Sequence, residues 1–139
     1  MDQQQIQESQ GIAAKTCPFC CLDPVRIIAT NNHAFAIFDG FPISPNHMLI
    51  IPKRHIASLF EATEEEHSAL FDLLTNMRER LFRKRGTAGF NIGINDGEAA
   101  GQTVMHLHIH LIPRYAGDMS DPRGGIRWIF PDKAIYWNK

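Results

Sequence analysis

The stretch His106-Leu107-His108-Ile109-His110-Leu111-Ile112 decides the fold class of this chain of 139 residues. Successive side chains of a β-strand point to opposite faces, so the alternation predicts three imidazoles on one face, about 6.7 Å between neighbours, and aliphatic side chains on the other. Three histidines in a purely structural core would each need a buried hydrogen-bond partner of their own. The pattern therefore indicates a functional site on one face of a strand, which we expect to run from Thr103 to Ile112.

The spacing by itself leaves two kinds of site open, a metal centre that uses all three histidines and a nucleophilic imidazole. A metal centre is disfavoured because the outer two histidines would be about 13 Å apart at the backbone. A neutral imidazole is nucleophilic when a hydrogen bond keeps the proton on its other ring nitrogen. His108 has a histidine on either side, and the preceding loop Asn95–Thr103 supplies backbone N–H groups, an amide and a hydroxyl that suit an anion.

Short β-rich runs separated by turn residues surround this stretch, and one helical pattern interrupts them. Besides Thr103–Ile112, the predicted strands are Val25–Thr30, His33–Phe38, His47–Ile51 and Phe90–Asn95. The helix should begin at Thr63, because Thr63-Glu64-Glu65-Glu66 fits a capping box, and it should stop near Gly86. The chain is therefore predicted to be an α+β domain, with a mostly antiparallel sheet of about five strands and one long helix on one face.

Composition narrows the classes of partner. A formal net charge of -1, from 14 Lys and Arg against 15 Asp and Glu, argues against a general basic surface for nucleic acid. No apolar run approaches the roughly 18 residues of a membrane span, and the N-terminus lacks the basic and apolar regions of a signal peptide. We therefore expect a cytoplasmic protein without nucleic-acid or membrane partners.

The two ends of the chain differ in composition from the middle. Residues 1–15 are polar and rich in Gln, which predicts a flexible arm, and residues 16–117 form the predicted domain. Residues 118–139 combine aromatic residues with Arg123 and Arg127 and should pack back on the domain as a tail. Two roles stay open for these arginines, contact with the distal phosphates of a long substrate and packing within the tail.

The histidine stretch closely resembles the signature of the histidine triad (HIT) superfamily, which reads His, apolar, His, apolar, His, apolar, apolar. The resemblance extends to Phe38-Asp39, Pro45–Lys53, Gly101–Val104 and Pro113-Arg114, and it covers most of residues 17–115. Within the superfamily the chain looks most like the fragile-histidine-triad hydrolases of dinucleoside polyphosphates. The resemblance implies a nucleotide substrate and a two-fold homodimer.

The resemblance also implies a role for individual residues. His108 would attack the α-phosphorus of a nucleotide to give a nucleotidyl-histidine intermediate, His110 would contact the transferred phosphoryl group, and His106 completes the triad. The implied nucleotide-binding residues surround the ribose and the phosphate: Asp39 at the ribose, His47 and Asn95 beside the site, and Gly101, Gln102 and Thr103 at the non-bridging phosphate oxygens.

The three cysteines, Cys17, Cys20 and Cys21, are too close together to staple distant parts of a fold. Taken alone, Cys17-Pro18-Phe19-Cys20 fits a zinc site, a redox pair or plain buried thiols, although no predicted strand precedes it as in thioredoxin-like redox motifs. It resembles the start of many bacterial HIT proteins that hold a structural zinc at this place. The resemblance implies that His55 and His106 would complete such a zinc site in this chain.

Three functions are carried forward from the sequence. The first is hydrolysis of dinucleoside polyphosphates at an α-phosphate, and the second is nucleoside phosphoramidase activity, the other main branch of the superfamily. The third, from a different class, is a catalytically idle nucleotide-binding module.

Overall fold

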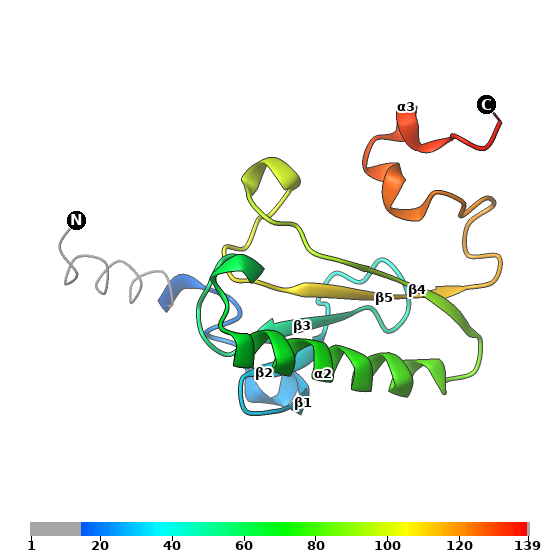
Figure 1. Ribbon diagram of the computed structural model, residues 1–139. Coiled ribbons are helices and arrows are strands. Elements are labelled where there is room, and N and C mark those ends of the chain that lie inside the picture. The colour runs from blue at the N-terminus through cyan, green and yellow to red at the C-terminus, as the bar shows by residue number, and fades with distance from the viewer. Residues whose placement is uncertain (1–14, 139) are drawn as a thin grey trace.

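The computed structural model describes residues 15–138, so only Lys15 of the predicted polar arm lies within the described range. Over this range the strands form a five-stranded sheet in the order β1-β2-β3-β5-β4, and every neighbouring pair is antiparallel (Figure 1). The elements are β1 Ile27–Thr30, β2 Ala34–Phe38, β3 Met48–Pro52, α2 Glu64–Phe82, β4 Thr87–Gly93 and β5 Ile109–Tyr115. The predicted α+β class is confirmed.

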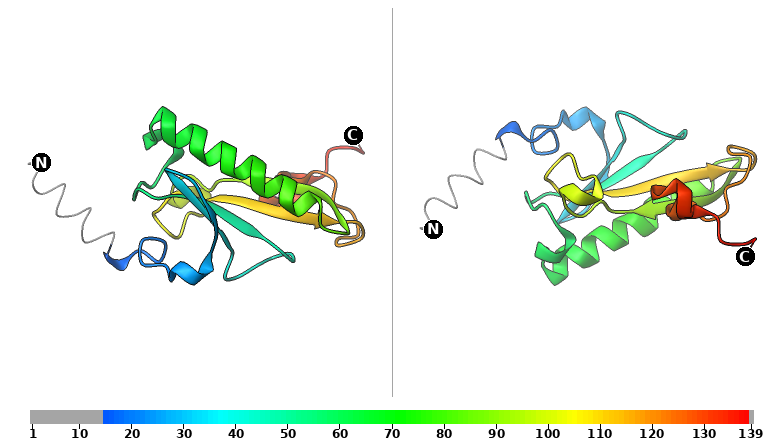
Figure 2. Two further views of the ribbon diagram at one scale, coloured as in Figure 1. Left: turned by 90° about the horizontal axis from the view of Figure 1, so that it is seen from below. Right: turned by 90° about the horizontal axis from the view of Figure 1, so that it is seen from above.

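Helix α2 covers one face of the sheet, as Figure 1 and Figure 2 show. Its capping box forms as predicted, because the Thr63 side chain accepts from the Glu66 backbone N–H while the Glu66 side chain accepts from the Thr63 backbone N–H. Alternate residues of the strands meet the apolar stripe of the helix, and this core includes Ala34, Ala36, Met48, Ile50, Leu70, Leu74, Leu81, Ile109 and Leu111. The helix ends at Phe82, earlier than predicted, and Gly86 adopts its positive φ of 94° in the turn to β4.

The histidine strand starts later than the sequence predicts. Strand β5 pairs with β3 only from Ile109 to Leu111, and residues 103–108 precede it. Pro113, which we expected to close the strand, lies inside it opposite Phe90 of β4. A proline is tolerated there because β3 no longer runs alongside β5 at this point, so the missing N–H costs no ladder bond on that side.

Of the three histidines, only His110 lies within β5, and it is on the sheet face opposite the helix; His106 and His108 come just before the strand. Leu107, Ile109 and Leu111 are buried, and Ile109 belongs to the core that packs against α2. The alternating His108 and His110 therefore face away from the helix. A second apolar cluster on this face consists of Phe35, Ile37, Leu49 and Ile51, with Phe19 and Leu22 of the N-terminal segment packed against it.

The C-terminal tail lies on the side of the sheet opposite α2, over β4 and β5 (Figures 1 and 2). It contains a 3-10 turn, Gly125–Ile129, and the short helix α3, Pro131–Ala134. No helix in residues 15–138 combines the length and apolar character that crossing a membrane requires.

Candidate functional site

The centre of the site is formed by Asp39, which follows β2, His47, which precedes β3, and His110 of β5. Register places Leu49 of β3 opposite His110, which brings the residue before β3 beside the same imidazole. His47 Nε2 lies 2.9 Å from His110 Nδ1 and 3.4 Å from Asp39 Oδ2. Asp39 and His47, which flank one loop, thus form a polar cluster on the sheet face with His110, which is 63 positions after His47.

A backbone N–H settles the proton positions in this cluster. The Ile43 backbone N–H donates to His47 Nδ1 at 3.2 Å, so this nitrogen carries a lone pair and the proton of the neutral ring is on Nε2. His47 Nε2–H then donates to His110 Nδ1. His110 must therefore hold its own proton on Nε2, where it can donate to an oxygen of a ligand.

His108 has the opposite arrangement, which suits a nucleophile. Its Nδ1 lies 2.8 Å from the carbonyl oxygen of His106. A carbonyl oxygen only accepts, so Nδ1 carries the proton and Nε2 of the neutral ring carries a lone pair. The two rings of His108 and His110 lie next to each other, with centroids 5.2 Å apart.

Burial favours the neutral form of the two histidines in this cluster. Desolvation, followed by the neighbouring rings of His108 and His47, lowers the pKa of His110 from 6.5 to about 4. Desolvation also lowers the pKa of His47, although Asp39 opposes the change. In the unliganded protein His110 is therefore a neutral hydrogen-bond donor rather than a charged acid.

The cluster opens into a cavity of about 1030 Å³ between the sheet and the tail. Its polar lining residues are Asp39, Ser44, His47, Asn91, Asn95, His110, Arg114 and Asp118. Most of its remaining wall is apolar, and includes Phe41, Ile43, Ile92, Ile112, Ile126, Trp128 and Ile129. An extended ligand with one end at His110 has room for an apolar or aromatic group at the other end.

The predicted phosphate loop contains the 3-10 turn Glu98–Ala100, and the side chain of Gln102 makes hydrogen bonds within the protein. Gln102 is buried, its Oε1 accepts from the Gly97 N–H at 2.9 Å, and its amide donates to Ala57 and Val104 carbonyl oxygens at 2.8 and 3.1 Å. An amide used in this way shapes the loop. Thr103 is exposed, and Gly101 closes a 3-10 turn with a positive φ of 92°; their contacts with phosphate stay predictions.

A second cluster brings together all four residues predicted as zinc ligands: Cys17, Cys20, His55 and His106, with one ligand atom of each within 4.8 Å of the others. His106 Nδ1 lies 3.5 Å from Cys17 Sγ, 3.4 Å from Cys20 Sγ and 3.2 Å from His55 Nδ1. Cys20 Sγ is 3.2 Å from His55 Nδ1. A tetrahedral zinc with bonds of about 2.0–2.1 Å to nitrogen and about 2.3 Å to sulfur has edges of roughly 3.3–3.8 Å.

The surroundings of this cluster also fit a metal. His106 is fully buried, and its Nε2–H donates to the Pro52 carbonyl oxygen at 2.8 Å, which leaves the Nδ1 lone pair pointing at the two thiols. Burial and the neighbouring Cys17 thiol raise the pKa of Cys20 to about 11, so a bound cation would have to displace the proton. The donor set and its spacing therefore fit a closed four-ligand site.

Phe19 is a site residue that the sequence did not single out. Its ring lies edge-on to His106 and to His108, with centroids 5.8 and 5.1 Å apart. It stands between the two cysteines of the metal cluster and so links that cluster to the proposed nucleophile. The only sequence feature that could have indicated this role is the position of Phe19 between Cys17 and Cys20.

The tail arginines are used inside the tail. Arg123 pairs with Asp121 at 2.9 Å and stacks on Trp137. Arg127 donates to the carbonyl oxygens of Lys133 and Ala134 and stacks on Tyr136. Of the two roles left open by the sequence, these contacts favour packing.

Comparison with known proteins agrees with the geometry. A family model described as the HIT domain matches residues 23–117. A 16.1 kDa HIT-like protein of Mycoplasma pneumoniae is 34% identical over 112 residues, 78% of each chain. The asymmetrical bis(5'-nucleosyl)-tetraphosphatase of Schizosaccharomyces pombe is 40% identical over 80 residues, which are 58% of this chain and 44% of that enzyme.

Among solved structures, a zinc-bound histidine triad family protein from Mycobacterium smegmatis superposes with a TM-score of 0.69 and 32% identity. The match covers 78% of this chain and 81% of that one. The region 23–117 that matches the family model contains the sheet, helix α2 and the histidine strand. The chain described here therefore belongs to the HIT domain family.

Proposed function

We propose that the protein hydrolyses dinucleoside polyphosphates at an α-phosphate, with His108 as the nucleophile. One observation carries the proposal: His108 Nδ1 is held by the His106 carbonyl oxygen at 2.8 Å, which leaves a lone pair on Nε2. The similarity to a bis(5'-nucleosyl)-tetraphosphatase over 80 residues supports the substrate class.

In the proposed reaction Nε2 of His108 forms a bond to the α-phosphorus while the bond from that phosphorus to the bridging oxygen breaks. The leaving group takes the electron pair and departs as a nucleoside polyphosphate anion. Water then attacks the phosphorus and releases one proton to solvent, the N–P bond breaks with its electrons returning to Nε2, and a nucleoside monophosphate leaves. The proton on His108 Nδ1 stays on the ring throughout and remains hydrogen-bonded to the His106 carbonyl oxygen.

In this proposal the protonation state of His110 determines which leaving groups can depart readily. Its Nε2–H can donate to a phosphoryl oxygen, and in the unliganded protein, where its pKa is about 4, the ring carries no second proton near neutral pH. A departing polyphosphate is already a stable anion, whereas a departing amine must be protonated. The site therefore favours phosphoanhydrides over phosphoramidates.

The apolar cavity supports a substrate with two nucleosides. If the α-phosphate lies between His108 and His110, the leaving half extends past Asn95 toward the wall that includes Trp128. Aromatic walls suit a nucleobase because its two faces are apolar. Asp39, which lines the same cavity, can accept from ribose hydroxyls.

We infer that the cysteine and histidine cluster binds zinc in a structural role. Zinc bound by Cys17, Cys20, His55 and His106 would have a closed coordination shell and would stabilise the fold. These four residues would tie the N-terminal segment to the turn before the histidine strand. We also propose that the protein assembles as a homodimer and is located in the cytoplasm. Sedimentation analysis tests the homodimer.

The test compares diadenosine tri- and tetraphosphate with an adenosine phosphoramidate, using wild-type protein and His108→Asn. We expect a higher kcat/KM for the polyphosphates, with AMP among the products, and turnover that disappears in the variant. A preference for the phosphoramidate would assign the protein to the phosphoramidases. Substrate that is bound but left intact by the wild-type protein would make it a binding module.

A further inference from the structure

The segment Pro52–Ala57 holds the active-site segment 102–108 at several points. The Pro52 carbonyl oxygen accepts from His106 Nε2 at 2.8 Å, and the Ile56 carbonyl oxygen accepts from the Leu107 N–H at 2.6 Å. The Ala57 carbonyl oxygen accepts from the Gln102 amide at 2.8 Å. These bonds replace the strand ladder, which begins only at Ile109.

The contacts matter because His106 orients the next histidine. Its carbonyl oxygen accepts from His108 Nδ1 at 2.8 Å and so decides where Nε2 of His108 points. A shift of His106 therefore turns the proposed nucleophile. The conformation of residues 52–57 therefore affects the position of Nε2 of His108.

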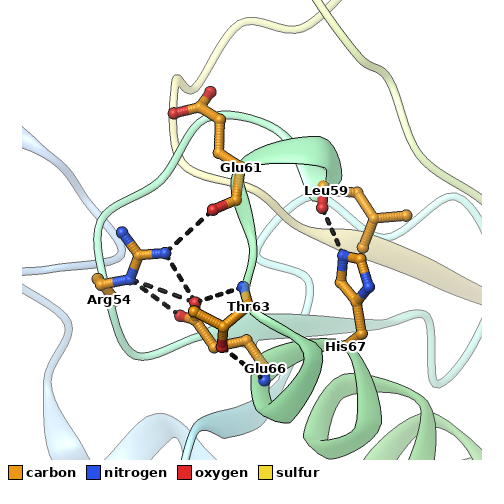
Figure 3. Close-up of polar contacts among 6 residues, drawn as sticks. All are labelled: Arg54, Leu59, Glu61, Thr63, Glu66 and His67. Carbon is orange, nitrogen blue, oxygen red and sulfur yellow. Dashed lines mark hydrogen bonds and ion pairs between the residues drawn. The ribbon is translucent and has the colours of Figure 1, made fainter.

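Residues 53–58 lie between the end of β3 and the short turn Leu59–Glu61, outside any helix or strand. Arg54, in the middle of this segment, reaches the start of α2 (Figure 3). Its guanidinium donates to the Glu66 carboxylate through Nη2 at 2.7 Å and through Nε at 3.2 Å, and Nη2 also donates to the Glu61 carbonyl oxygen at 3.1 Å. One side chain thus joins the segment both to the turn Leu59–Glu61 and to the first turn of α2.

Glu66 is a fixed anchor for this clamp. It is 4% exposed, and its Oε1 also accepts from the Thr63 backbone N–H at 3.0 Å. The Arg54 side chain, followed by the Thr63 backbone N–H, lowers the pKa of Glu66 to about 2, so the carboxylate is charged at every pH of interest. Because the helix holds the carboxylate in place, Arg54 must come to it, and the backbone of residues 52–57 follows.

We propose that the Arg54–Glu66 pair is a positioning device for the active-site segment, holding His106 and, through its carbonyl oxygen, the nucleophile His108. The kinetic consequence rests on the function proposed above, whereas the structural consequence does not. Arg54 and Glu66 are positioning residues that act at a distance from the substrate.

The test uses Arg54→Met, which keeps an apolar stem and removes the guanidinium. The matched control is Thr63→Ala, which removes the hydroxyl that caps Glu66 N at 3.1 Å but leaves the ion pair in place. Both variants weaken the start of the helix, so both should lower the melting temperature. All measurements are made at a temperature at which near-ultraviolet circular dichroism shows each variant to be folded.

The decisive readout is hydrogen exchange of the Leu107 amide, because this proton is bonded to the Ile56 carbonyl oxygen. We expect exchange about tenfold faster in Arg54→Met than in Thr63→Ala, through local opening of the 52–57 contacts. Arg54→Lys should restore part of the protection, since one ammonium cannot reproduce the paired contacts of a guanidinium. Equal exchange in Arg54→Met and Thr63→Ala would overturn the proposal.

The kinetic readout separates positioning from general stability. We expect kcat for diadenosine triphosphate to fall on the order of tenfold in Arg54→Met with KM nearly unchanged, because the reacting nitrogen is misplaced while the binding groups remain. Thr63→Ala should keep wild-type kcat, and a matching loss there would also contradict the proposal. Absence of hydrolysis by the wild-type protein would reject the proposed function, while Leu107 exchange would still decide on the positioning role.

Discussion

The pH dependence of folding stability tests the environment of His110. Burial and the neighbouring histidines lower the pKa of this residue from 6.5 to about 4 in the folded protein. Between these two values the unfolded chain binds a proton at this position that the folded protein does not bind. Titration of His110 therefore leaves the folding stability unchanged above about pH 6.5 and lowers it as the pH decreases from there toward about 4.

The size of the effect follows from the difference between the two pKa values. A pKa lower by about 2.5 corresponds to at most about 3.4 kcal/mol, at about 1.4 kcal/mol for each factor of ten. The His110 ring is half-buried and lines an open cavity, so solvent screening reduces this figure. Taking about half, we expect His110 to account for about 1.5 kcal/mol of the stability lost on acidification.

The assay is urea unfolding of wild-type protein and His110→Asn at pH 7.5 and at about pH 4.5. Wild-type protein should lose about 1.5 kcal/mol more than the variant between the two conditions. The four candidate metal ligands are present in both proteins, so their proton uptake cancels in the difference. The exposed His33, replaced by Asn, serves as the control and should behave like wild-type protein. An equal loss in wild-type protein and His110→Asn would refute the argument.

Three further predictions concern the nucleophile, the metal and the tail. Replacing His108 by Asn or Gly should lower turnover by several orders of magnitude while AMP still binds, since the residues proposed to contact phosphate and ribose are unchanged; an adduct trapped on another histidine would contradict this. Metal analysis should find one zinc per chain, and this zinc should be absent from a Cys17→Ser, Cys20→Ser double variant. The melting temperature of the variant should fall far more than its phosphate affinity, and a stable metal-free wild-type protein would disprove the site. Because both tail arginines are bonded within the tail, Arg123→Ala with Arg127→Ala should change KM equally for tri- and tetraphosphate substrates, and a larger effect on the tetraphosphate would restore their contact with distal phosphates.

The sequence alone was sufficient wherever a local pattern carries the information. The alternation of histidines and aliphatic residues predicted which side chains share a face, and Leu107, Ile109 and Leu111 are buried accordingly. The capping box predicted the start of α2 because it depends on residues three apart. The resemblance to the HIT superfamily, also visible in the sequence, named the four residues that the fold brings together as a candidate metal site.

Tertiary structure alone decided features that depend on partners distant in the sequence. The tautomer of His110 follows from the Ile43 N–H through His47, and no local pattern shows that a loop amide will meet that imidazole. No local pattern shows either that the fold brings the Ala57 carbonyl oxygen to the amide of Gln102. Unpaired polar groups become costly only once folding has removed water around them, so the final partners of these side chains are set by packing and not by sequence spacing.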